Sequence, residues 1–484
     1  MSGIVGADNQ FGKDFDSPSP TAQGTIVAIY DIGCAVGSLM CFAFGQKLGR
    51  RRMIMLGAAT MLVGTAILTS STTRAQLIVG RGNGFNSSSI PVYQSETCEG
   101  RKRGALVCLN SAITILGLVI AYFLDYGLSF VDGPVQWRLP IGFQAVFALL
   151  LLIQAATLPE TPRWLMSQGR KDEALDVLSR LAAPPDQRTP EVKALIQERL
   201  RDIEESLARE SAGGPFRYAE LLQGGPLGNF RRVVLACGVN VMQQFTGANM
   251  INYLASPTAP VVYQNTMGLS RNLSLILGGC TAITYLVASF IPLWTVDRFG
   301  RRPLLMVSAT GLSACFLLAA VLLSVGTKSA AYGATAMVFV FQIFLGIGFL
   351  PIPWLYPAEV SHTRIRAYTS AISSFANWMC VFAVVEMTPP AIAQIGWRVF
   401  IIFAVLNACW VPIVYIFFPE TANLSLEDVD HLFEKGGITG GVWGAPGGRT
   451  VAAHSDRLAG PDALEAHNDE EKNRQGEIQY VERN

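Results

Sequence analysis

Three amide side chains and one hydroxyl crowd into a short stretch of an otherwise apolar segment. Gln243, Gln244, Thr246 and Asn249 all fall within residues 243–249. Such groups are costly in lipid unless they are hydrogen-bonded, and an uncharged amide can both donate and accept. This chemistry suits a ligand rich in hydroxyl groups. Alternatively, these side chains only bind neighbouring helices and hold the segment in place.

A second candidate site is a proline-rich segment around an aromatic residue. Pro351, Pro353 and Pro357 interrupt an apolar run and surround Trp354. Proline leaves backbone carbonyls without their helical partner, and an indole ring offers a flat apolar face. The two features together suit the ring of a sugar. A kinked helix that only packs against its neighbours would show the same pattern.

Charged residues recur where apolar runs end. The set consists of Glu96, Arg103, Glu160, Asp297, Arg298, Arg301, Glu359, Arg366 and Glu420. A charge at the edge of a membrane is expensive unless it is paired. We therefore expect acids and bases of this set to clamp two parts of the protein together on one face, as a gate that opens and closes. Ordinary anchoring at the membrane surface is the simpler alternative.

No pattern indicates catalysis or a metal site. The nine cysteines lie mostly in apolar runs and form no CxxC pair, so we interpret them as small apolar side chains. The four histidines supply no arrangement of nucleophile and base. We expect no enzyme activity, no cofactor and no metal. The formal net charge of +1 gives no reason to expect nucleic acid as a partner.

The elements that position these residues are apolar helices. Half of the 484 residues are apolar and only 15% are charged, whereas soluble proteins have about 25% charged residues. Eleven runs approach the length of about 20 residues that spans a bilayer. The expected spans are 22–46, 53–71, 76–95, 104–126, 138–158, 233–256, 272–296, 303–326, 331–357, 368–388 and 398–418. The sequence thus predicts an all-α polytopic membrane protein.

A long polar segment divides the spans into two groups. Residues 159–232 contain twelve basic and twelve acidic side chains and follow a helical pattern. We expect an N-terminal bundle over 1–158, a cytoplasmic helical linker over 159–232 and a six-helix bundle over 233–434. The Gly- and charge-rich stretch 435–484 is typical of a disordered tail.

Basic residues in short loops predict the orientation in the membrane. Twelve Lys and Arg residues lie in the loops 47–52, 101–103, 298–302 and 364–366. The loops of the opposite side hold Arg74, Arg271 and Lys328. Cytoplasmic loops are the richer in basic residues. We therefore expect the first set of loops, the linker and the C-terminus in the cytoplasm, and the N-terminus outside.

Three signatures occur twice and in the same order. Residues 46–51 return as 297–302, Glu96 with Arg103 returns as Glu359 with Arg366, and Trp137 with Pro159-Glu160-Thr161 returns as Trp397 with Pro419-Glu420-Thr421. This recurrence indicates a duplicated bundle with two pseudo-symmetric halves. The first signature follows the second span of the second half but the first span of the first half. The repeat therefore predicts twelve helices less the first one, or about eleven.

These signatures resemble those of the fungal sugar porters of the major facilitator superfamily. The resemblance covers about 1–435 and rests on 91–96, 159–165, 243–249, 297–302 and 419–421. It implies a six-plus-six helix bundle with a sugar site between the halves, alternating access and, in fungi, proton coupling. It also implies a monomeric multi-pass protein of the plasma membrane, with a sugar or polyol and protons as partners.

The resemblance assigns site residues by matching position. Those that would bind or face the sugar are Gln243, Gln244, Asn249 and Trp354. Asn377 and Ser111 stand where many hexose porters have glutamine, and they complete the expected substrate site. Because both side chains are shorter, the site fits a plain hexose less well, and a smaller polyol such as glycerol, or another sugar, becomes a plausible substrate.

Proton coupling in the family depends on an acid in the first helix, which has no counterpart here. Its usual partner corresponds to Arg81. A buried arginine without a partner is strongly destabilising. We hypothesise that Asp31, within the first predicted span, pairs with Arg81 or takes up protons. Glu386 is a further carboxylate within a span, and the sequence does not assign it to the substrate path.

Three departures from the family pattern concern the chain itself. The first helix lacks a counterpart, Gly82-Asn83-Gly84 follows Arg81 without the usual intervening residues, and 254–258 resembles an insertion. They indicate either divergence or a gene model with altered start and splice choices. Two alternatives to a working transporter therefore stay open, a non-transporting nutrient sensor and an inactive truncated transporter.

Overall fold

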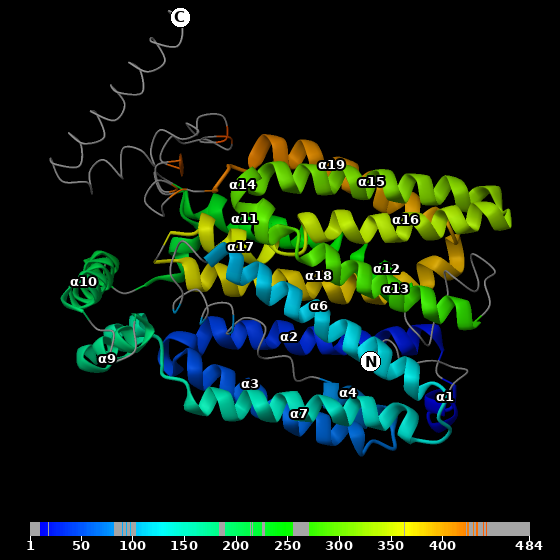
Figure 1. The fold of residues 1–484 in the computed structure, drawn as a ribbon, viewed down its shortest axis with the longest axis horizontal. Helices are drawn as coiled ribbons and strands as arrows, with labels where there is room; N and C mark the ends of the chain where they lie inside the picture. The colour runs from blue at the N-terminus through cyan, green and yellow to red at the C-terminus, as the bar shows by residue number, and fades with distance from the viewer. Residues whose placement is uncertain are drawn as a thin grey trace, which may run out of the picture.

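The computed structural model describes residues 10–17, 19–81, 103–182, 189–212, 216–224, 228–254, 271–362 and 364–422, with positions 90, 93, 97, 214, 424, 429, 432, 433, 439 and 442. Every regular element in these ranges is a helix, which confirms the all-α prediction. Long helices lie side by side in one bundle, and α9 and α10 stand apart from it at one end (Figure 1). We call that end the linker end and the opposite end the far end.

The first half of the bundle runs from α1 to α7. Its helices are α1 (Gln10–Asp14), α2 (Pro20–Leu48), α3 (Arg50–Thr69), α4 (Arg74–Arg81), α6 (Arg103–Leu128) and α7 (Val135–Thr157). α2 begins where Ser19 accepts a hydrogen bond from the Ala22 N–H and Pro20 takes the first helical position. The remainder of the predicted span 76–95 lies largely outside the described residues.

A polar segment joins the two halves at the linker end. It contains α8 (Pro162–Ser167), α9 (Lys171–Ala182), α10 (Pro190–Ala212) and the short 3-10 helix η3 (Tyr218–Leu222). The apolar faces of α9 and α10 bury Val177, Ile196 and Leu200 against the indole of Trp164. Lys171 and Glu204 form an ion pair across them at 2.8 Å. The outer faces are polar, as expected for helices in water.

The second half runs from α11 to α19. Its helices are α11 (Asn229–Gln244), α12 (Ala248–Leu254), α13 (Arg271–Ser289), α14 (Pro292–Phe299), α15 (Arg301–Val325), α16 (Lys328–Ile347), α17 (Ile352–Val360), α18 (Arg366–Ile395) and α19 (Arg398–Phe417). Three predicted spans are broken helix pairs: α11 with α12, α13 with α14, and α16 with α17. The second pair bends by 44° just before Pro292, and the third breaks at Pro351. Proline explains both breaks, because it removes a helical hydrogen bond.

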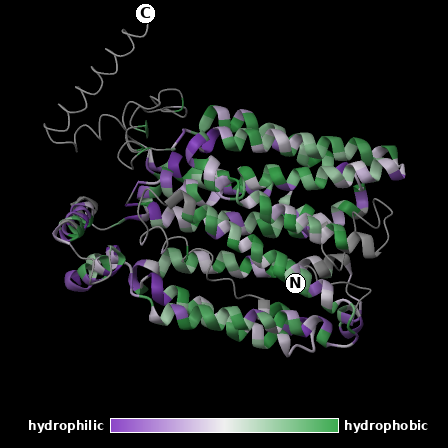
Figure 2. Cartoon of the chain, in the orientation of Figure 1, coloured by the Kyte–Doolittle hydropathy of each residue, from purple (hydrophilic) through white to green (hydrophobic). Residues whose placement is uncertain are grey.

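The long helices are suited to lipid. Within the described ranges, eight helices are long and apolar enough to cross a membrane, and the bent pair α13 and α14 would make a ninth. Large apolar side chains point outward from them; Val63 on α3 is 62% exposed and Trp294 on α14 is 72% exposed. Apolar residues cover the shafts of the helices, while polar ones gather at the linker end (Figure 2). A surface of this kind requires hydrocarbon as its solvent.

Among the described residues, the halves meet mainly through α2 and α6 of the first half. α2 packs along α18, and α6 packs along α13 and α14. In the first pair Ala28 of α2 is buried against Val381 and Val385 of α18. The halves therefore meet through long, mainly apolar helix faces, and polar contacts between them stand out against this background.

Candidate functional site

The amide-rich segment lies at the break between α11 and α12. Gly247 has φ +86°, and a Cβ there would lie 2.7 Å from the ring of Phe316, so only glycine fits. The Thr246 hydroxyl donates to the Gln243 carbonyl at 2.6 Å. The Asn407 side chain, on α19, donates to the Thr246 carbonyl at 3.1 Å. The break is thus held by specific bonds, and it turns the amides toward α18.

Three amides from three helices form one chain of hydrogen bonds, which we call the amide chain. Asn249 donates from Nδ2 to Oε1 of Gln244 at 2.6 Å. Gln244 donates in turn from Nε2 to Oδ1 of Asn377 on α18, also at 2.6 Å. Gln244 is 7% exposed and Asn377 is 1% exposed. A ligand hydroxyl, which donates and accepts, can replace any of these links without leaving a polar atom unpaired.

Gln243 contacts a different element from its neighbour. Its Nε2 donates to the Phe349 carbonyl at 2.6 Å, in the turn between α16 and α17. Asn240, one turn earlier, donates to the Pro353 carbonyl at 3.1 Å. Both bonds satisfy carbonyls at the proline break beside Trp354, which is half-buried on α17. Gln243 therefore joins the two broken helices, a role that the sequence pattern did not separate from ligand binding.

Ser111 lies on α6, in the first half. Its side chain is 7% exposed, and its hydroxyl donates to the Val107 carbonyl of its own helix at 3.0 Å. A serine side chain bonded in this way reaches less far than a glutamine side chain at the same position would.

Sequence reasoning missed two further polar residues near the break. Gln342 on α16 is 1% exposed and donates from Nε2 to Oδ1 of Asn252 on α12 at 3.2 Å. Asn407, which holds the break, was also missed. The available signal was a lone amide within an apolar span, and such a residue in lipid needs a partner.

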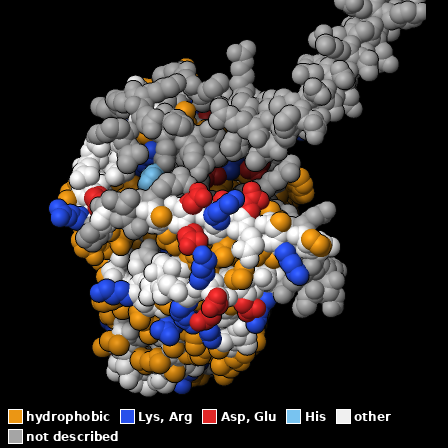
Figure 3. All heavy atoms as spheres, turned by 90° about the vertical axis from the view of Figure 1, so that its left-hand side faces the viewer, with side chains coloured by type: hydrophobic (Ala, Val, Ile, Leu, Met, Phe, Trp, Pro, Cys, Tyr) orange, Lys and Arg blue, Asp and Glu red, His pale blue; other side chains and the backbone are white. Residues whose placement is uncertain are grey.

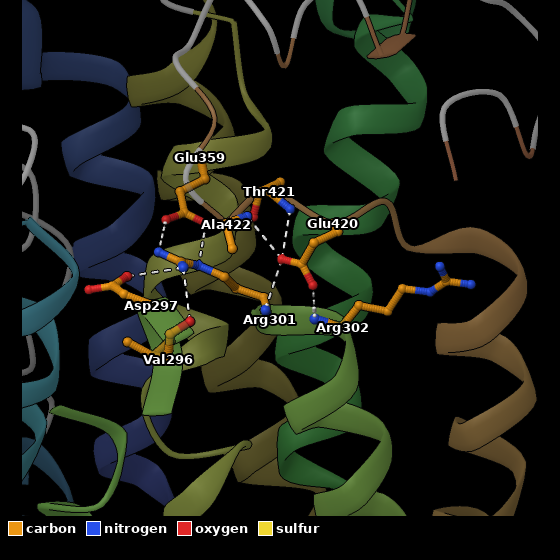
Figure 4. A network of polar contacts seen from close by, with 8 residues as sticks. All are labelled: Val296, Asp297, Arg301, Arg302, Glu359, Glu420, Thr421 and Ala422. Atoms are coloured by element: carbon orange, nitrogen blue, oxygen red, sulfur yellow. Dashed lines mark hydrogen bonds and ion pairs between the residues drawn. The ribbon is translucent and has the colours of Figure 1, made fainter. Parts of the chain in front are cut away.

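The arginine-rich turn of the second half surrounds Glu420 (Figure 4). The Glu420 carboxylate accepts hydrogen bonds from the backbone N–H groups of Arg301 and Arg302, each at 2.9 Å. These groups lie at the N-terminus of α15, where the helix dipole favours a negative charge. Gly300 precedes them with φ +88°, and a Cβ there would lie 2.5 Å from the carboxylate.

The first half repeats this arrangement. Glu160 accepts from the N–H groups of Arg50 at 2.8 Å and Arg51 at 3.0 Å, at the start of α3. Gly49 has φ +87° and would clash with Glu160 if it carried a Cβ. The tyrosine hydroxyls match as well, since Tyr93 donates to the Pro159 carbonyl and Tyr356 to the Pro419 carbonyl. We call each arrangement a glutamate clasp.

Arg301 completes the second clasp with side-chain bonds. Its guanidinium binds Glu359 at 2.7 and 3.1 Å and Asp297 at 3.1 Å (Figure 4). Glu359 also accepts from the Thr421 hydroxyl at 2.7 Å. All these partners belong to the second half. These bonds therefore stay within one half, whereas the expected clamp between the halves, which includes Glu96 and Arg103, stays a prediction.

The remaining charged residues of the set are placed as follows. The Arg366 guanidinium donates to the Ser361 carbonyl at 3.4 Å, and the Arg298 guanidinium lies 5.7 Å from the ring centroid of Phe299. Both contacts are local to the second half. Glu96 and the side chain of Arg103 lie outside the described residues, so their expected pairing is not tested.

Aromatic side chains join the halves at the linker end. Phe42 of α2 stacks on Tyr218 of η3 and meets Tyr368 of α18 edge-on, with ring centroids 5.3 Å apart in both pairs. Phe216, just before η3, stacks on Tyr368 at 3.9 Å. We call these four residues the aromatic wedge. The wedge thus packs two rings of the linker against the halves, Tyr218 against Phe42 of α2 and Phe216 against Tyr368 of α18.

An ion pair fixes the wedge to the second half. Arg364 binds both carboxylate oxygens of Glu220, at 2.7 and 2.9 Å, and also donates to the Gly214 carbonyl. The hydrogen bonds from Arg364 hold the pKa of the Glu220 carboxyl below its ordinary value. Basic and acidic side chains gather across this end of the molecule (Figure 3). The bidentate geometry is that of a strong, charge-assisted contact between the linker and the bundle.

The candidate proton-coupling residues are only partly described. Asp31 lies on α2, is 6% exposed, and takes part in an interaction. The side chain of Arg81, at the end of α4, is outside the described residues, so the predicted Asp31–Arg81 pair stays a prediction.

Comparison with known proteins gives one consistent result. A family model described as "Sugar (and other) transporter" matches residues 6–433. The MFS-type transporter oryC of Aspergillus oryzae is 38% identical over 435 residues, which is 87% of this chain and 79% of the relative. The sugar transporter STL1 of Saccharomyces cerevisiae is 36% identical over 433 residues, 87% of this chain and 74% of the relative. The solved structure of the proton:xylose symporter XylE superposes with a TM-score of 0.71 at 23% identity, covering 85% of this chain and 89% of that one.

Proposed function

The chain belongs to the sugar transporter family of the major facilitator superfamily, and on that premise we propose that it carries a sugar or polyol across a membrane by alternating access. The match to this family confirms the resemblance that the motifs indicated. Members of the family are transporters and not enzymes. The XylE-like bundle is the fold expected for this class.

The amide chain is the observation that carries the proposal. Asn249, Gln244 and Asn377 come from α12, α11 and α18, beside a helix break and at the surface where the second half faces α2. Uncharged donors and acceptors suit hydroxyl groups better than they suit ions or apolar solutes. We propose that substrate hydroxyls take the place of bonds within the chain, with Trp354 and Ser111 completing the site. The short Ser111 and Asn377 favour a compact polyol alongside hexoses and pentoses.

Alternating access requires contacts between the halves that can be made and broken. The glutamate clasps keep each half rigid, because their bonds stay within that half. The aromatic wedge and the Arg364–Glu220 pair cross between elements at the linker end. We propose that these contacts close the cytoplasmic side and part when that side opens. The basic residues of the short loops support a cytoplasmic position for this end, and we infer a plasma-membrane monomer with its C-terminus in the cytoplasm.

Uptake by yeast that lacks its own sugar and polyol carriers tests the function. The chain, fused to a fluorescent tag, would be assayed with labelled glucose, xylose and glycerol at pH 5 and 7.5. We expect uptake of at least one of them, faster at pH 5 if a proton enters with it. Gln244→Ala should raise KM about tenfold or more, because it removes two links of the amide chain. Gln154→Ala, at an exposed position on α7, is the matched control and should behave as the parent.

Two results would contradict the proposal. The first is uptake of all three solutes at background level by a chain that reaches the plasma membrane, which would favour the sensor or the inactive transporter. The second is uptake that Gln244→Ala leaves unchanged, which would place the substrate away from the amide chain.

A further inference from the structure

Glu386 forms a polar contact between the two halves, on the far-end side of the amide chain. It lies on α18, and its Oε1 accepts a hydrogen bond from the Thr25 hydroxyl of α2 at 3.0 Å. The surrounding contacts between these helices are apolar and involve Ala28, Val381 and Val385. One carboxyl group therefore interrupts the apolar face along which the halves meet.

The second oxygen of this carboxyl group is the informative one. Oε2 of Glu386 is buried and has no hydrogen-bond partner among the described residues. An ionised carboxylate in such a place loses its hydration without full compensation, which is expensive. A neutral carboxyl group avoids that cost and still accepts the bond from Thr25. The closed α2–α18 face therefore fits the protonated form of Glu386.

The titratable side chains of the surrounding elements supply no described counter-charge at this level. They are Tyr30, Asp31, Cys34, Cys41 and Lys47 on α2, Arg231, Arg232 and Cys237 on α11, Tyr253 on α12, Tyr356 and Glu359 on α17, Arg366, Tyr368 and Cys380 on α18, and Arg398, Cys409 and Tyr415 on α19. Arg366, the basic residue on the same helix, lies roughly 30 Å away by helix rise. Asp31, roughly 9 Å along α2 from Thr25, is itself an acid, so it would further oppose an ionised Glu386.

We propose that Glu386 must bind a proton before α2 and α18 can close at the far end. When the halves part there, water reaches the carboxyl group and it releases its proton to the far side. When they close, the group takes a proton from that side and keeps it. Acid on the far side then favours the closed face, and transport becomes dependent on external pH through a residue outside the amide chain. The inference rests on the proposed alternating access and names the group that titrates.

A labelling experiment tests the inference without substrate. Val27, beside this face on α2, is replaced by cysteine in a full chain whose nine native cysteines are changed to alanine or serine. An impermeant maleimide is applied from outside to intact yeast cells at pH 5 and 7.5. Because maleimide reacts with the thiolate, whose fraction itself falls between pH 7.5 and pH 5, every labelling rate is expressed relative to that of free cysteine with the same reagent at the same pH. We expect this relative rate to be about threefold or more lower at pH 5. Glu386→Gln, a neutral mimic, should label slowly at both pH values.

Two variants serve as controls. Thr25→Val keeps the shape but removes the donor, and should label faster at pH 5. Asp132→Asn changes an exposed acid in the turn before α7 and should keep the pH dependence of the parent. A Glu386→Gln chain whose relative labelling rate is still higher at pH 7.5 than at pH 5 would overturn the inference, as would a relative rate of the parent that does not respond to pH.

Uptake measurements separate this inference from the proposed function. If labelling follows pH through Glu386 but none of the labelled solutes enters the cells, the inference stands and the assigned function fails. If solutes enter and labelling ignores pH, the function stands and the inference fails.

Discussion

Each glutamate clasp works through backbone atoms at the start of a helix. Glu160 and Glu420 accept from N–H groups that a helix leaves without partners. The side chains of the same arginines bind other groups, as Arg301 binds Glu359. The carboxylate can approach this closely only because Gly49 and Gly300 carry no Cβ. Glycine and glutamate thus form one functional unit.

Replacing the clasp glycines tests this unit. Gly300 has φ +88° and ψ 170°, a conformation that only glycine adopts readily. We expect Gly300→Ala to cost roughly 3 kcal/mol or more of stability, from strain and from displacement of Glu420. Gly49→Ala should behave alike. The measurement is thermal unfolding of the tagged protein in detergent.

Gly326→Ala is the control for those variants. Gly326 also has positive φ, at +70°, but nothing lies within 4 Å of the added Cβ. Its expected cost is only ~1 kcal/mol. Equal losses at Gly326 and Gly300 would mean that backbone strain alone matters and that the carboxylate contributes little.

The ion pair of Glu220 predicts a pH dependence. Because Arg364 lowers the pKa of the folded-state carboxyl below the ordinary 4.5, the pair contributes stability above that value. This contribution disappears as the pH falls through the lowered pKa. The melting temperature of the parent should exceed that of Glu220→Gln at pH 6, and the two should converge near ~pH 3. A gap that persists at low pH would contradict the assignment.

At the scale of elements, most helix positions could be predicted and most breaks could not. The span predicted over 303–326 is observed as α15, Arg301–Val325, because a long apolar run has few alternatives in lipid. The proline break near Trp354 was expected. The break at Gly247 was not, because its cause is distant in sequence: Asn407 binds the Thr246 carbonyl, and Phe316 fills the space beside the glycine.

Asn407 therefore offers a test of the break. Its side chain is fully buried and donates to the carbonyls of Thr246 and Phe403. Asn407→Ala should cost about 1–3 kcal/mol, since it leaves a buried carbonyl without its partner, and should lower the uptake rate by loosening the amide chain. Unfolding and uptake of the purified and cellular protein measure the two effects. Asn110→Ala, at a partly exposed position on α6, is the control; a similar loss there would argue against a specific role for Asn407.

The site could be predicted only in part, for the same reason. Amides in an apolar segment identified Gln243, Gln244 and Asn249 as candidates. Which of them bind one another and which hold the fold depends on the turn at Phe349 and on α18. Local sequence does not encode those distances, so Gln243 could not be distinguished from Gln244 before the helices were placed.

At the scale of the whole molecule, two halves meet along α2–α18 and α6–α13, and the linker contributes to the contact. The duplication in sequence is matched by duplicated contacts around Glu160 and Glu420. The expectation that charges of the two halves join them directly came from counting charges on one face, and it stays a prediction, because Glu96 and the side chain of Arg103 lie outside the described residues. Helix termini compete for such charges. In the second half, the N-terminus of α15 binds Glu420, and Arg301 binds Glu359 and Asp297.

A double-mutant cycle tests the wedge as a closure of the linker end. Glu220→Gln and Arg364→Gln should each raise the rate at which Cys41, kept as the single cysteine on α2, is labelled in inside-out vesicles. An increase of about two- to fivefold corresponds to the ~0.4–1 kcal/mol expected of such a pair. The double variant should label no faster than either single one. Additive effects would show that the two residues act separately.

The glutamate clasps also have a consequence for how the chain is made. Glu160 follows its partners Arg50 and Arg51 in the chain, so the first clasp can form once the ribosome has passed it, before the second half exists. The second clasp must wait for Glu420, which follows the end of α19 (Arg398–Phe417). During synthesis one half can reach its final arrangement while the other is still unfinished. If synthesis stops between the two glutamates, the first clasp can form and the second cannot. The N-terminus of α15 then stays uncapped, a feature by which membrane quality control could recognise the product.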